Sequence, residues 1–280
     1  MQQKPIKKIT GGSTQYDGAG VKLVRVIGYN DVHDFDPFLM LDAFDSTNPD
    51  DYTKGFPWHP HRGIETVTYL ITGKIEHGDS LGNSGTIDDG CCQWMTGGSG
   101  IIHQEMPQRC ERMLGSQLWI NLPQKDKMTD PAYRDIRQAQ IPVCKEAGAE
   151  IRVISGNYRD TNGPEQGDYV KTVYLDIKLD KNTAWSFSVH PEKTVFCYFV
   201  EGSALVGETK ERVEAHKAVL FGDGDTVSLT ATEEGVRLFF YAAKPLKEPI
   251  AWNGPIVMNT QEELRLASRE LREGTFIKHQ

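Results

Sequence analysis

The sequence has little that would place it in a membrane or outside the cell. Its longest apolar runs, such as Val195 to Val200, are far shorter than the roughly 20 residues that a membrane-spanning helix needs. No apolar stretch near Met1 could serve as a signal peptide. The five cysteines are odd in number and irregular in spacing, which favours reduced thiols over a disulfide framework. These absences predict a cytoplasmic protein without a membrane segment.

Positive charge is also in short supply. Lys plus Arg total 31 against 39 for Asp plus Glu, so the net charge is -8. The charges are scattered and form no polybasic block. Because nucleic-acid-binding proteins present a basic face, direct binding to DNA or RNA is not expected. The 38% of hydrophobic residues is typical of a globular chain, and each half is long enough to bury its own core.

Helix signals are few, and short β-runs dominate the chain. The best helix signal is the capping box of Thr260 to Glu263, followed by apolar residues at helical spacing, and a second, short helix is expected after Pro131. The expected strands are Val21–Ile27, Thr66–Ile71, Gln117–Asn121, Ile151–Ile154, Val170–Leu179, Trp185–Val189, Thr194–Val200, Ala218–Phe221, Thr226–Leu229 and Val236–Ala242. Many short strands separated by turn residues predict an all-β fold of sandwiches or barrels.

A short internal repeat predicts two domains. Tyr69 to Gly73 recurs as Tyr198 to Gly202, and Gly97 to Gly100 aligns with Gly222 to Asp225. The mostly polar stretch after Arg134 predicts a linker between the two domains. We therefore predict an N-terminal domain over residues 1–134, a linker over 135–148, and a C-terminal domain over 149–280 that includes the C-terminal helix.

Two pairs of potential metal ligands lie in the N-terminal half. His59 and His61 are two residues apart, so on a strand both imidazoles project from the same face, and Glu65 follows on that face if the strand is regular. His103 and Glu105 repeat the arrangement. A lone His-x-His is commonly accidental, but two such pairs on adjacent strands can surround one ion and leave positions open. Imidazole and carboxylate ligands suit iron, nickel, copper, manganese or zinc, and the absence of cysteine disfavours a closed structural zinc site.

Specific phrases around these pairs resemble a known family. The segment Gly55-Phe-Pro-Trp-His-Pro-His-Arg-Gly-Ile-Glu-Thr-Val-Thr-Tyr-Leu-Ile-Thr-Gly73 resembles the first cupin motif, and most closely that of the pirin branch, whose hallmark is His-Pro-His-Arg-Gly-x-Glu-Thr-Val. The stretch from Gln93 to Pro107 is similarly pirin-like, as are Leu118 to Leu122 and Gly254 to Asn259. The resemblance extends from about Val21 to the C-terminal helix.

The resemblance implies an all-β bicupin: two antiparallel β-barrels of the jelly-roll type, facing each other, with metal only in the N-terminal one. It implies four ligands to one divalent ion, usually Fe(II): His59, His61, His103 and Glu105. Glu65 occupies the glutamate position of general cupins, which in pirins lies behind the ligands, so we expect it to hydrogen-bond near a ligand imidazole. Arg62 is expected either as a charge behind the ligands, as a clamp for substrate, or as a surface residue.

The repeat predicts that the second domain has lost the site. The two offsets carry His59, His61 and Glu65 onto Ser188, His190 and Thr194. They carry His103 and Glu105 onto Ser228 and Thr230. Only one of the four ligands survives, so the C-terminal domain is expected to bind no metal. The aromatic and methionine side chains that flank the first site either line a substrate cavity or belong to the core: Phe56, Trp58, Trp94, Met95 and Met106.

The pirin resemblance implies a flavonol 2,4-dioxygenase activity, in which a small aromatic substrate such as quercetin binds the metal and reacts with O2. In this hypothesis Glu105 accepts the proton of the flavonol 3-hydroxyl. The alternative is a non-enzymatic protein whose metal senses redox state, and which regulates a transcription factor or a metabolic enzyme by binding it. Members of the family are often monomeric, and no heptad pattern in the sequence suggests otherwise.

Overall fold

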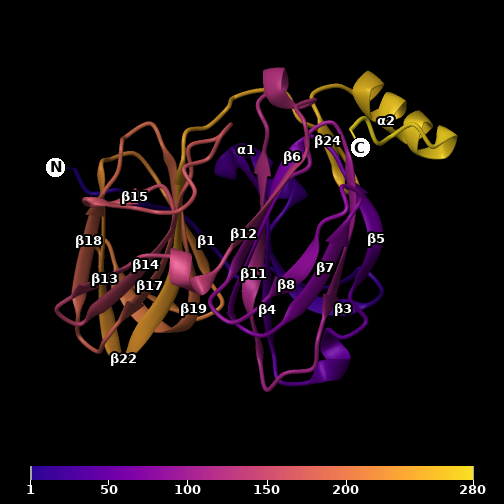
Figure 1. The fold of residues 1–280 in the computed structure, drawn as a ribbon. Helices are drawn as coiled ribbons and strands as arrows, with labels where there is room; N and C mark the ends of the chain where they lie inside the picture. The colour runs from indigo at the N-terminus through magenta and orange to yellow at the C-terminus, as the bar shows by residue number, and fades with distance from the viewer. Residues whose placement is uncertain (1, 280) are drawn as a thin grey trace. The chain divides into compact units, whose positions relative to one another are not determined.

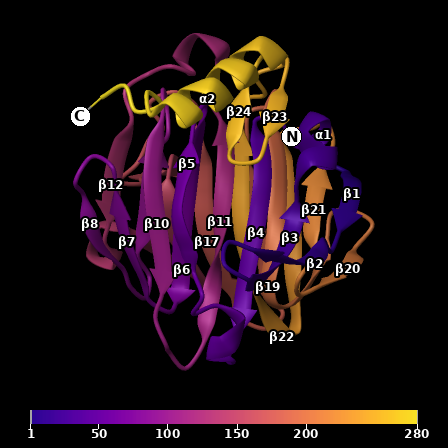
Figure 2. The ribbon, with the colours of Figure 1, turned by 90° about the vertical axis from the view of Figure 1, so that its right-hand side faces the viewer.

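The structure is a computed structural model that describes residues 2–279, and its contacts divide the chain into two compact units. The histidine unit contains Ser13–Val32, Phe38–Gln138 and residues 246–279, and therefore holds His59, His61 and His103. The second unit contains residues 2–12, His33–Pro37 and Ala139–Pro245. Both are built almost entirely from antiparallel strands (Figures 1 and 2), which confirms the predicted all-β fold.

Two sheets and one ribbon make up the histidine unit. The seven-stranded sheet runs in the order β12 (Ala132–Ile136), β9 (Cys92–Thr96), β6 (Ile64–Thr72), β11 (Met113–Asn121), β4 (Phe38–Ser46), β3 (Val21–Ile27), β2 (Ser13–Asp17). The four-stranded sheet runs in the order β5 (Phe56–His61), β10 (Ile101–Pro107), β7 (Ile75–Asp79), β8 (Ser84–Ile87). The ribbon pairs β23 (Ala251–Asn253) with β24 (Ile256–Met258). Strand β6 is buried over most of its length, as expected for the middle of a covered sheet.

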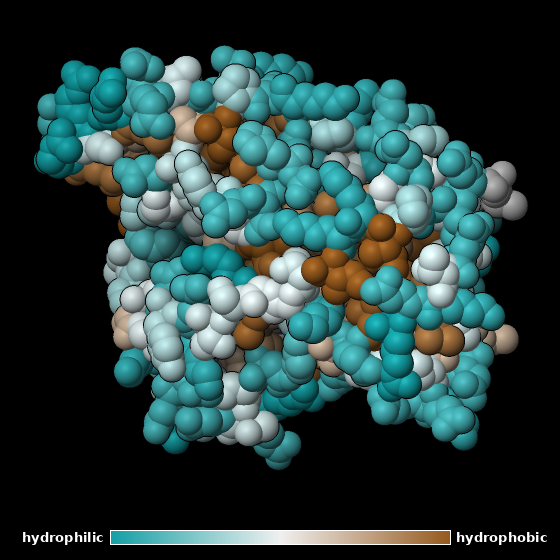
Figure 3. Space-filling model, turned by 180° about the vertical axis from the view of Figure 1, so that it is seen from behind, coloured by the Kyte–Doolittle hydropathy of each residue, from teal (hydrophilic) through white to brown (hydrophobic). Residues whose placement is uncertain are grey.

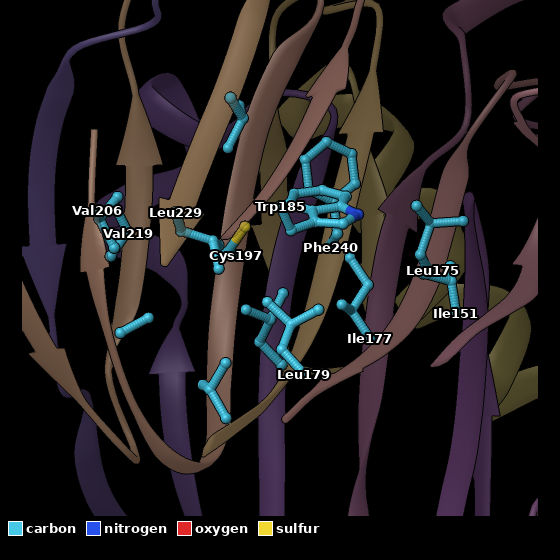
Figure 4. Packing of buried hydrophobic residues seen from close by; sticks show 14 of the residues in the cluster. Ile151, Leu175, Ile177, Leu179, Trp185, Cys197, Val206, Val219, Leu229 and Phe240 are labelled. Atoms are coloured by element: carbon cyan, nitrogen blue, oxygen red, sulfur yellow. The ribbon is translucent and has the colours of Figure 1, made fainter. Parts of the chain in front are cut away.

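The second unit is built around one large sheet. Its main path is β1 (Ile6–Thr10), β21 (Ala218–Phe221), β19 (Thr194–Val206), β22 (Thr226–Ala243), β17 (Val173–Leu179), β14 (Ala149–Ser155), β13 (Val143–Glu146). Two further strands join it, β18 (Ala184–Ser188) on β22 and β20 (Glu211–Glu214) on β19, and β15 (Asn157–Tyr158) pairs with β16 (Thr161–Asn162). Trp185, Cys197 and Phe240 point into its apolar core (Figure 4). Burial raises the pKa of the Cys197 thiol, so this cysteine behaves as a small apolar side chain.

Helices are short and few among the described residues. They are α1 (Val32–Phe35), α2 (Gln261–Glu273) and four 3₁₀ turns, η1 (Tyr29–Asp31), η2 (Pro49–Asp51), η3 (Gln124–Asp126) and η4 (Gln138–Gln140). The predicted capping box of α2 is confirmed, since Thr260 accepts from the Glu263 backbone and the Glu263 side chain accepts in return. The short helix expected after Pro131 is wrong, because that segment forms β12 on the edge of the seven-stranded sheet. None of the helices described could cross a membrane.

The units differ from the predicted continuous domains. Residues of β1 pair with β21, which adds the start of the chain to the second unit. The C-terminal helix belongs to the histidine unit, because Leu264 and Ala267 pack with β23, β24 and Ile102. Part of the predicted linker is also ordered sheet, since β13 pairs with β14 and β12 ends at Ile136. In the described part of the chain the sheets form jelly-roll layers and do not close into continuous barrels.

The face in Figure 3 is mainly hydrophilic and carries separate apolar patches among hydrophilic side chains. Among large apolar side chains, eight are at least a third exposed: Ile9, Tyr16, Tyr29, Trp58, Met128, Val143, Leu266 and Leu271. Scattered exposed residues of this kind are normal in soluble domains. Tyr29 and Trp58 are of interest because both lie near the histidines described next.

Candidate metal centre

Two neighbouring strands bring three histidines together. Strands β5 and β10 are antiparallel partners, with His59 opposite His103 and Ile101 opposite His61 (Figure 2). Alternate residues of β10 are buried, so His103 and Glu105 point to the same side. The ligand atoms of the three histidines all lie within 4.8 Å of one another. The structure therefore places in one cluster the three imidazoles that the sequence predicted as ligands.

Tight turns at the ends of these strands fix their register. Gly63, just after β5, has a φ of 75°, and a side chain there would meet the Val257 carbonyl oxygen at 2.0 Å. Its amide donates to the carbonyl of Gly98, in the turn before β10, over 2.8 Å. Gly98 also has a positive φ and lies against the Thr129 carbonyl. Only glycine fits both positions, which explains why glycines flank the two ligand pairs in the sequence.

Backbone carbonyls orient two of the imidazoles. His59 Nδ1 lies 2.9 Å from the Pro57 oxygen, and His61 Nδ1 lies 3.2 Å from the Pro255 oxygen. Since a carbonyl oxygen only accepts, each Nδ1 carries a ring proton. The two Nε2 atoms are 3.1 Å apart. An ion beside them would accept the lone pairs of both nitrogens, so the pair fits a metal ion.

His103 supplies the third nitrogen. Its side chain is 2% exposed, and within the described residues its Nε2 has no hydrogen-bond partner. Burial, followed by the neighbouring histidines, holds the pKa of His61 and of His103 well below the ordinary value, so both rings are neutral near pH 7. A buried and unsatisfied polar atom is costly. Three imidazoles that converge in this way have the donor chemistry of a divalent transition-metal site.

Glu105 lies beside this cluster but is not one of its three converging groups. Both of its carboxylate oxygens accept from Gln117 Nε2 at 2.9 Å, and one accepts from Thr68 Oγ1 at 3.2 Å. Gln117 is held in turn by Trp119, whose indole donates to the Gln117 amide oxygen over 3.1 Å. Glu105 is 3% exposed and lines the same cavity as His59 and His61. Hydrogen bonds therefore orient the Glu105 carboxylate beside the cluster of three histidines.

The two residues expected behind the ligands are both buried. Glu65 accepts a hydrogen bond from Thr96 over 2.8 Å and lies 3.7 Å from Arg134. Arg62 is 1% exposed, which rules out the surface alternative. It donates to the Ser99 carbonyl, and it binds the C-terminal segment through Phe276 and Glu270. Arg62 is not among the residues that line the cavity, so the substrate-clamp alternative has no support in the structure.

A cavity of about 630 Å³ opens onto His59 and His61. Its apolar wall consists of Tyr29, Met40, Phe56, Trp119 and Trp252. Of the side chains that the sequence left open between cavity and core, only Phe56 lines it. Trp94 and Met95 are core residues, and Trp58 is 55% exposed. Trp119 and Trp252 were missed as site residues, although both lie in or beside pirin-like segments.

A charged cluster forms the other side of this cavity. Arg25 donates to both carboxylate oxygens of Asp42, at 2.9 and 2.8 Å, and to Asp17 at 2.8 Å. Burial raises the pKa of Asp42 to about 6, although the hydrogen bonds from Arg25 act in the opposite direction. Sequence reasoning did not find these residues, because β2, β3 and β4 carry no motif and meet the cavity only in the folded unit.

The expected loss of metal from the second domain concerns positions on and beside β18 and β22, which are antiparallel partners. Ser188 and His190 line a separate cavity of about 350 Å³, while Ser228 donates to the Gln3 side chain. Over residues 2–279, the only group of three metal-ligating side chains found is that of His59, His61 and His103.

Two family models match this chain: the one described as pirin over residues 20–120, and the pirin C-terminal cupin domain over residues 174–277. A pirin-like protein of Caulobacter vibrioides is 41% identical over 279 residues, which cover 99% of this chain and 100% of that protein. A Pseudomonas aeruginosa protein named "Putative quercetin 2,3-dioxygenase" is also 41% identical, over 98% of both chains. A crystal structure of quercetin 2,3-dioxygenase from Acinetobacter baumannii superposes with a TM-score of 0.89 at 32% identity, over 98% of both chains.

Proposed function

Because this chain belongs to the pirin family of cupin proteins, we propose that it is a metal-dependent dioxygenase that opens the central ring of flavonols such as quercetin. The observation that carries the proposal is the convergence of three imidazoles beside a cavity with an aromatic wall. Pockets of about 300–1,000 Å³ hold small organic molecules, and this one lies within that range. The names of two relatives refer to the same reaction class.

We propose that His59, His61 and His103 hold one divalent ion, with Glu105 as the fourth ligand, and that the ion is Fe(II). The ligand atoms of the three histidines converge within 4.8 Å of one another, and Glu105 lines the same cavity as His59 and His61. When bound, such an ion supplies Lewis-acid chemistry and an electronic link between a flavonol and O2. Nickel, copper, manganese and zinc accept the same ligands, so the donor set does not choose among them.

The side chains around the metal site then contribute to substrate binding and to proton transfer. Trp119 and Phe56 offer flat apolar surfaces to a planar substrate. Glu105 takes the proton of the 3-hydroxyl group, and the amide of Gln117 and the hydroxyl of Thr68 hold the carboxylate in place for this transfer. Both atoms of O2 enter the product, and one ring carbon leaves as CO.

The first test is quercetin consumption with simultaneous measurement of O2 uptake and CO release. We expect turnover by the Fe(II)-loaded protein, and loss of turnover together with loss of bound metal in His59→Ala. In Glu105→Gln we expect retention of most of the metal and a fall in kcat of about 10² to 10⁴, the range for a lost general base. Full turnover by Glu105→Gln would contradict the role of the base. Ring opening without CO would contradict the 2,4-cleavage.

One observation favours the alternative, in which the metal regulates a partner protein. His61 hydrogen-bonds to Pro255, and the adjacent Arg62 binds Phe276 and Glu270 near the exposed helix α2. A change of charge at the ion could therefore reach a surface element through two direct contacts. Absence of turnover by a protein shown to be replete with metal, together with metal-dependent capture of a partner, would replace the dioxygenase proposal with this one.

A further inference from the structure

A row of aromatic rings connects the metal cluster to the surface of the histidine unit. The His61 ring contacts Trp119 edge to face, with the ring centroids 5.1 Å apart. Trp119 lies 5.9 Å from Trp252, and Trp252 lies 5.7 Å from Tyr29. All three separations are within the range of direct ring contact. The row begins at a ligand imidazole and ends at a phenol that is 67% exposed.

The composition of this row suits the movement of single electrons. Indole and phenol are the most easily oxidised ring side chains of proteins, and the probability of electron tunnelling falls exponentially with distance. Steps between touching rings are therefore much faster than one long step from the surface to the ion. The other ring contact that leaves the cluster, from His59 to Phe56 at a centroid distance of 6.5 Å, ends at a benzene ring that is hard to oxidise.

The hydrogen bonds along the row allow the two indoles to pass a positive charge on, and they allow the Tyr29 phenol to end as a stable radical. The Trp119 indole donates to the Gln117 amide oxygen over 3.1 Å, and the Trp252 indole donates to the Gly254 carbonyl over 2.7 Å. Both acceptors are neutral and weakly basic, so an oxidised indole keeps its proton and can pass the charge on. Tyr29 makes no hydrogen bond through its hydroxyl to another described residue, and its exposure lets the phenol release its proton to water.

We propose that Tyr29, Trp252 and Trp119 carry one electron from the surface to the metal site, so that an oxidant that reaches the ion without substrate does not damage the ligands. The proposal rests on metal binding by the three histidines and not on flavonol turnover. With hydrogen peroxide as oxidant, two electrons are needed to make two waters. One comes from the divalent ion, which becomes trivalent, and one comes from Tyr29 through the two indoles. The phenol proton and one solvent proton complete the two waters, and a neutral tyrosyl radical remains.

The experiment uses the full chain loaded with Fe(II), with unbound iron removed and the bound iron measured. Hydrogen peroxide is added below one equivalent in the absence of any flavonol, and samples are frozen for electron paramagnetic resonance. Oxidised residues are located by peptide mass spectrometry. We expect a tyrosyl signal in the wild type, with Tyr29 as the oxidised residue.

Two variants interrupt the row at different points. Tyr29→Phe is expected to lose the tyrosyl signal. Trp252→Leu is expected to lose it as well and to increase oxidation of Trp119 and His61, because the charge cannot leave the interior. The matched control is Tyr16→Phe, since Tyr16 is 72% exposed but lies outside the row. This variant should keep the full signal.

Three outcomes would overturn the inference. They are an unchanged tyrosyl signal in Tyr29→Phe, an equal loss in Tyr16→Phe, or an iron-replete wild type in which peroxide produces no radical at Tyr29. A protein that binds no iron would instead remove the premise, because it would contradict the metal assignment itself. Flavonol turnover has no part in the measurement, so failure of the dioxygenase proposal would leave these results unaffected.

Discussion

At the scale of single residues, the site depends on side chains that hold the predicted ligands rather than on the ligands alone. His59 and His61 are oriented by carbonyls of Pro57 and Pro255, and Glu105 is oriented by Gln117. Such supporting contacts commonly change affinity or activity by one to two orders of magnitude when they are removed. Two predictions follow from individual contacts of this kind.

The first concerns Gln117. In Gln117→Leu, Glu105 loses the amide donor that lies 2.9 Å from each of its oxygens, and the carboxylate is free to rotate. We expect kcat for quercetin to fall by about 10- to 100-fold, with most of the metal retained by the three histidines. Steady-state kinetics and metal analysis test this. Thr68→Val is the matched control, because it removes the 3.2 Å hydrogen bond to Glu105 and the 3.0 Å hydrogen bond from Gln117 but leaves Gln117 bound to Glu105, so it should have a smaller effect. An equal loss in both variants would contradict the orienting role of Gln117.

The second concerns Asp42 and pH. Burial raises its pKa from the ordinary value of 3.8 to about 6, so the folded protein binds this proton more tightly than the unfolded chain does. Ionisation of Asp42 therefore lowers stability as the pH rises from about 4 to 6, by up to about 3 kcal/mol. In Asp42→Asn this contribution is absent, and the decline in unfolding free energy between pH 4 and 7 should be smaller than in the wild type. Urea unfolding across this range provides the measurement.

Asp45→Asn is the control for that comparison. Asp45 lies on the same strand and binds Arg112 at 2.8 Å, but its side chain is 29% exposed. The contributions of the histidines are common to all three proteins and cancel in the differences. A flattened pH profile in Asp45→Asn as well would show that the effect does not arise from burial of Asp42.

At the scale of elements, the sequence identified many of the longer strands and the one substantial helix, because alternation and capping are local properties, but it missed β4 and most of the short strands. It divided β22 into two strands at Gly235, whereas the structure continues the strand through this residue with a φ of 75°. It also assigned β1 to the N-terminal domain and α2 to the C-terminal domain because of their positions in the chain, whereas each belongs to the other unit. Their partners, β21 and β24, are distant in sequence, so no local pattern could have revealed the exchange.

The same limit applied to the site. The histidines were found because each pair lies on one strand with a fixed two-residue spacing. Tyr29, Trp119 and Trp252 come from three separate elements and form a wall only after folding. The sequence left open whether Arg62 is buried or exposed, because its partners Phe276 and Glu270 lie more than 200 residues away in the chain.

A third prediction concerns the contact between strand β24 and the turn at Gly63, which follows strand β5 with His59 and His61. Buried Lys127 donates to the Gly63 and Val257 carbonyls at 2.8 Å and to Asn121. Lys127→Met leaves these acceptors without their donor, which should cost about 3 kcal/mol. Metal content should also fall, because Gly63 lies two residues from His61. Denaturant unfolding and metal analysis test both effects.

Lys125→Met is the control for this prediction, since Lys125 belongs to the same turn but its side chain is 83% exposed. It should be within about 0.5 kcal/mol of the wild type, as is usual for surface positions. A similar loss in both variants would mean that the turn itself, rather than the buried ammonium group, connects the two strands.

At the scale of the whole molecule, the three histidines lie in one of two compact units, and the last prediction concerns the separate stabilities of these units. An ion that binds only the folded histidine unit stabilises it by about 4 kcal/mol when its free concentration is 1,000 times the Kd. We expect calorimetry to show two transitions in the wild type, of which one moves to higher temperature on addition of Fe(II) under anaerobic conditions and returns on addition of a chelator. His59→Ala should abolish the shift, whereas His190→Ala, at the position of the second unit that the repeat aligns with His61, should leave it unchanged. A shift of both transitions, or a loss of the shift in His190→Ala, would place metal in the second unit as well and contradict its predicted loss there.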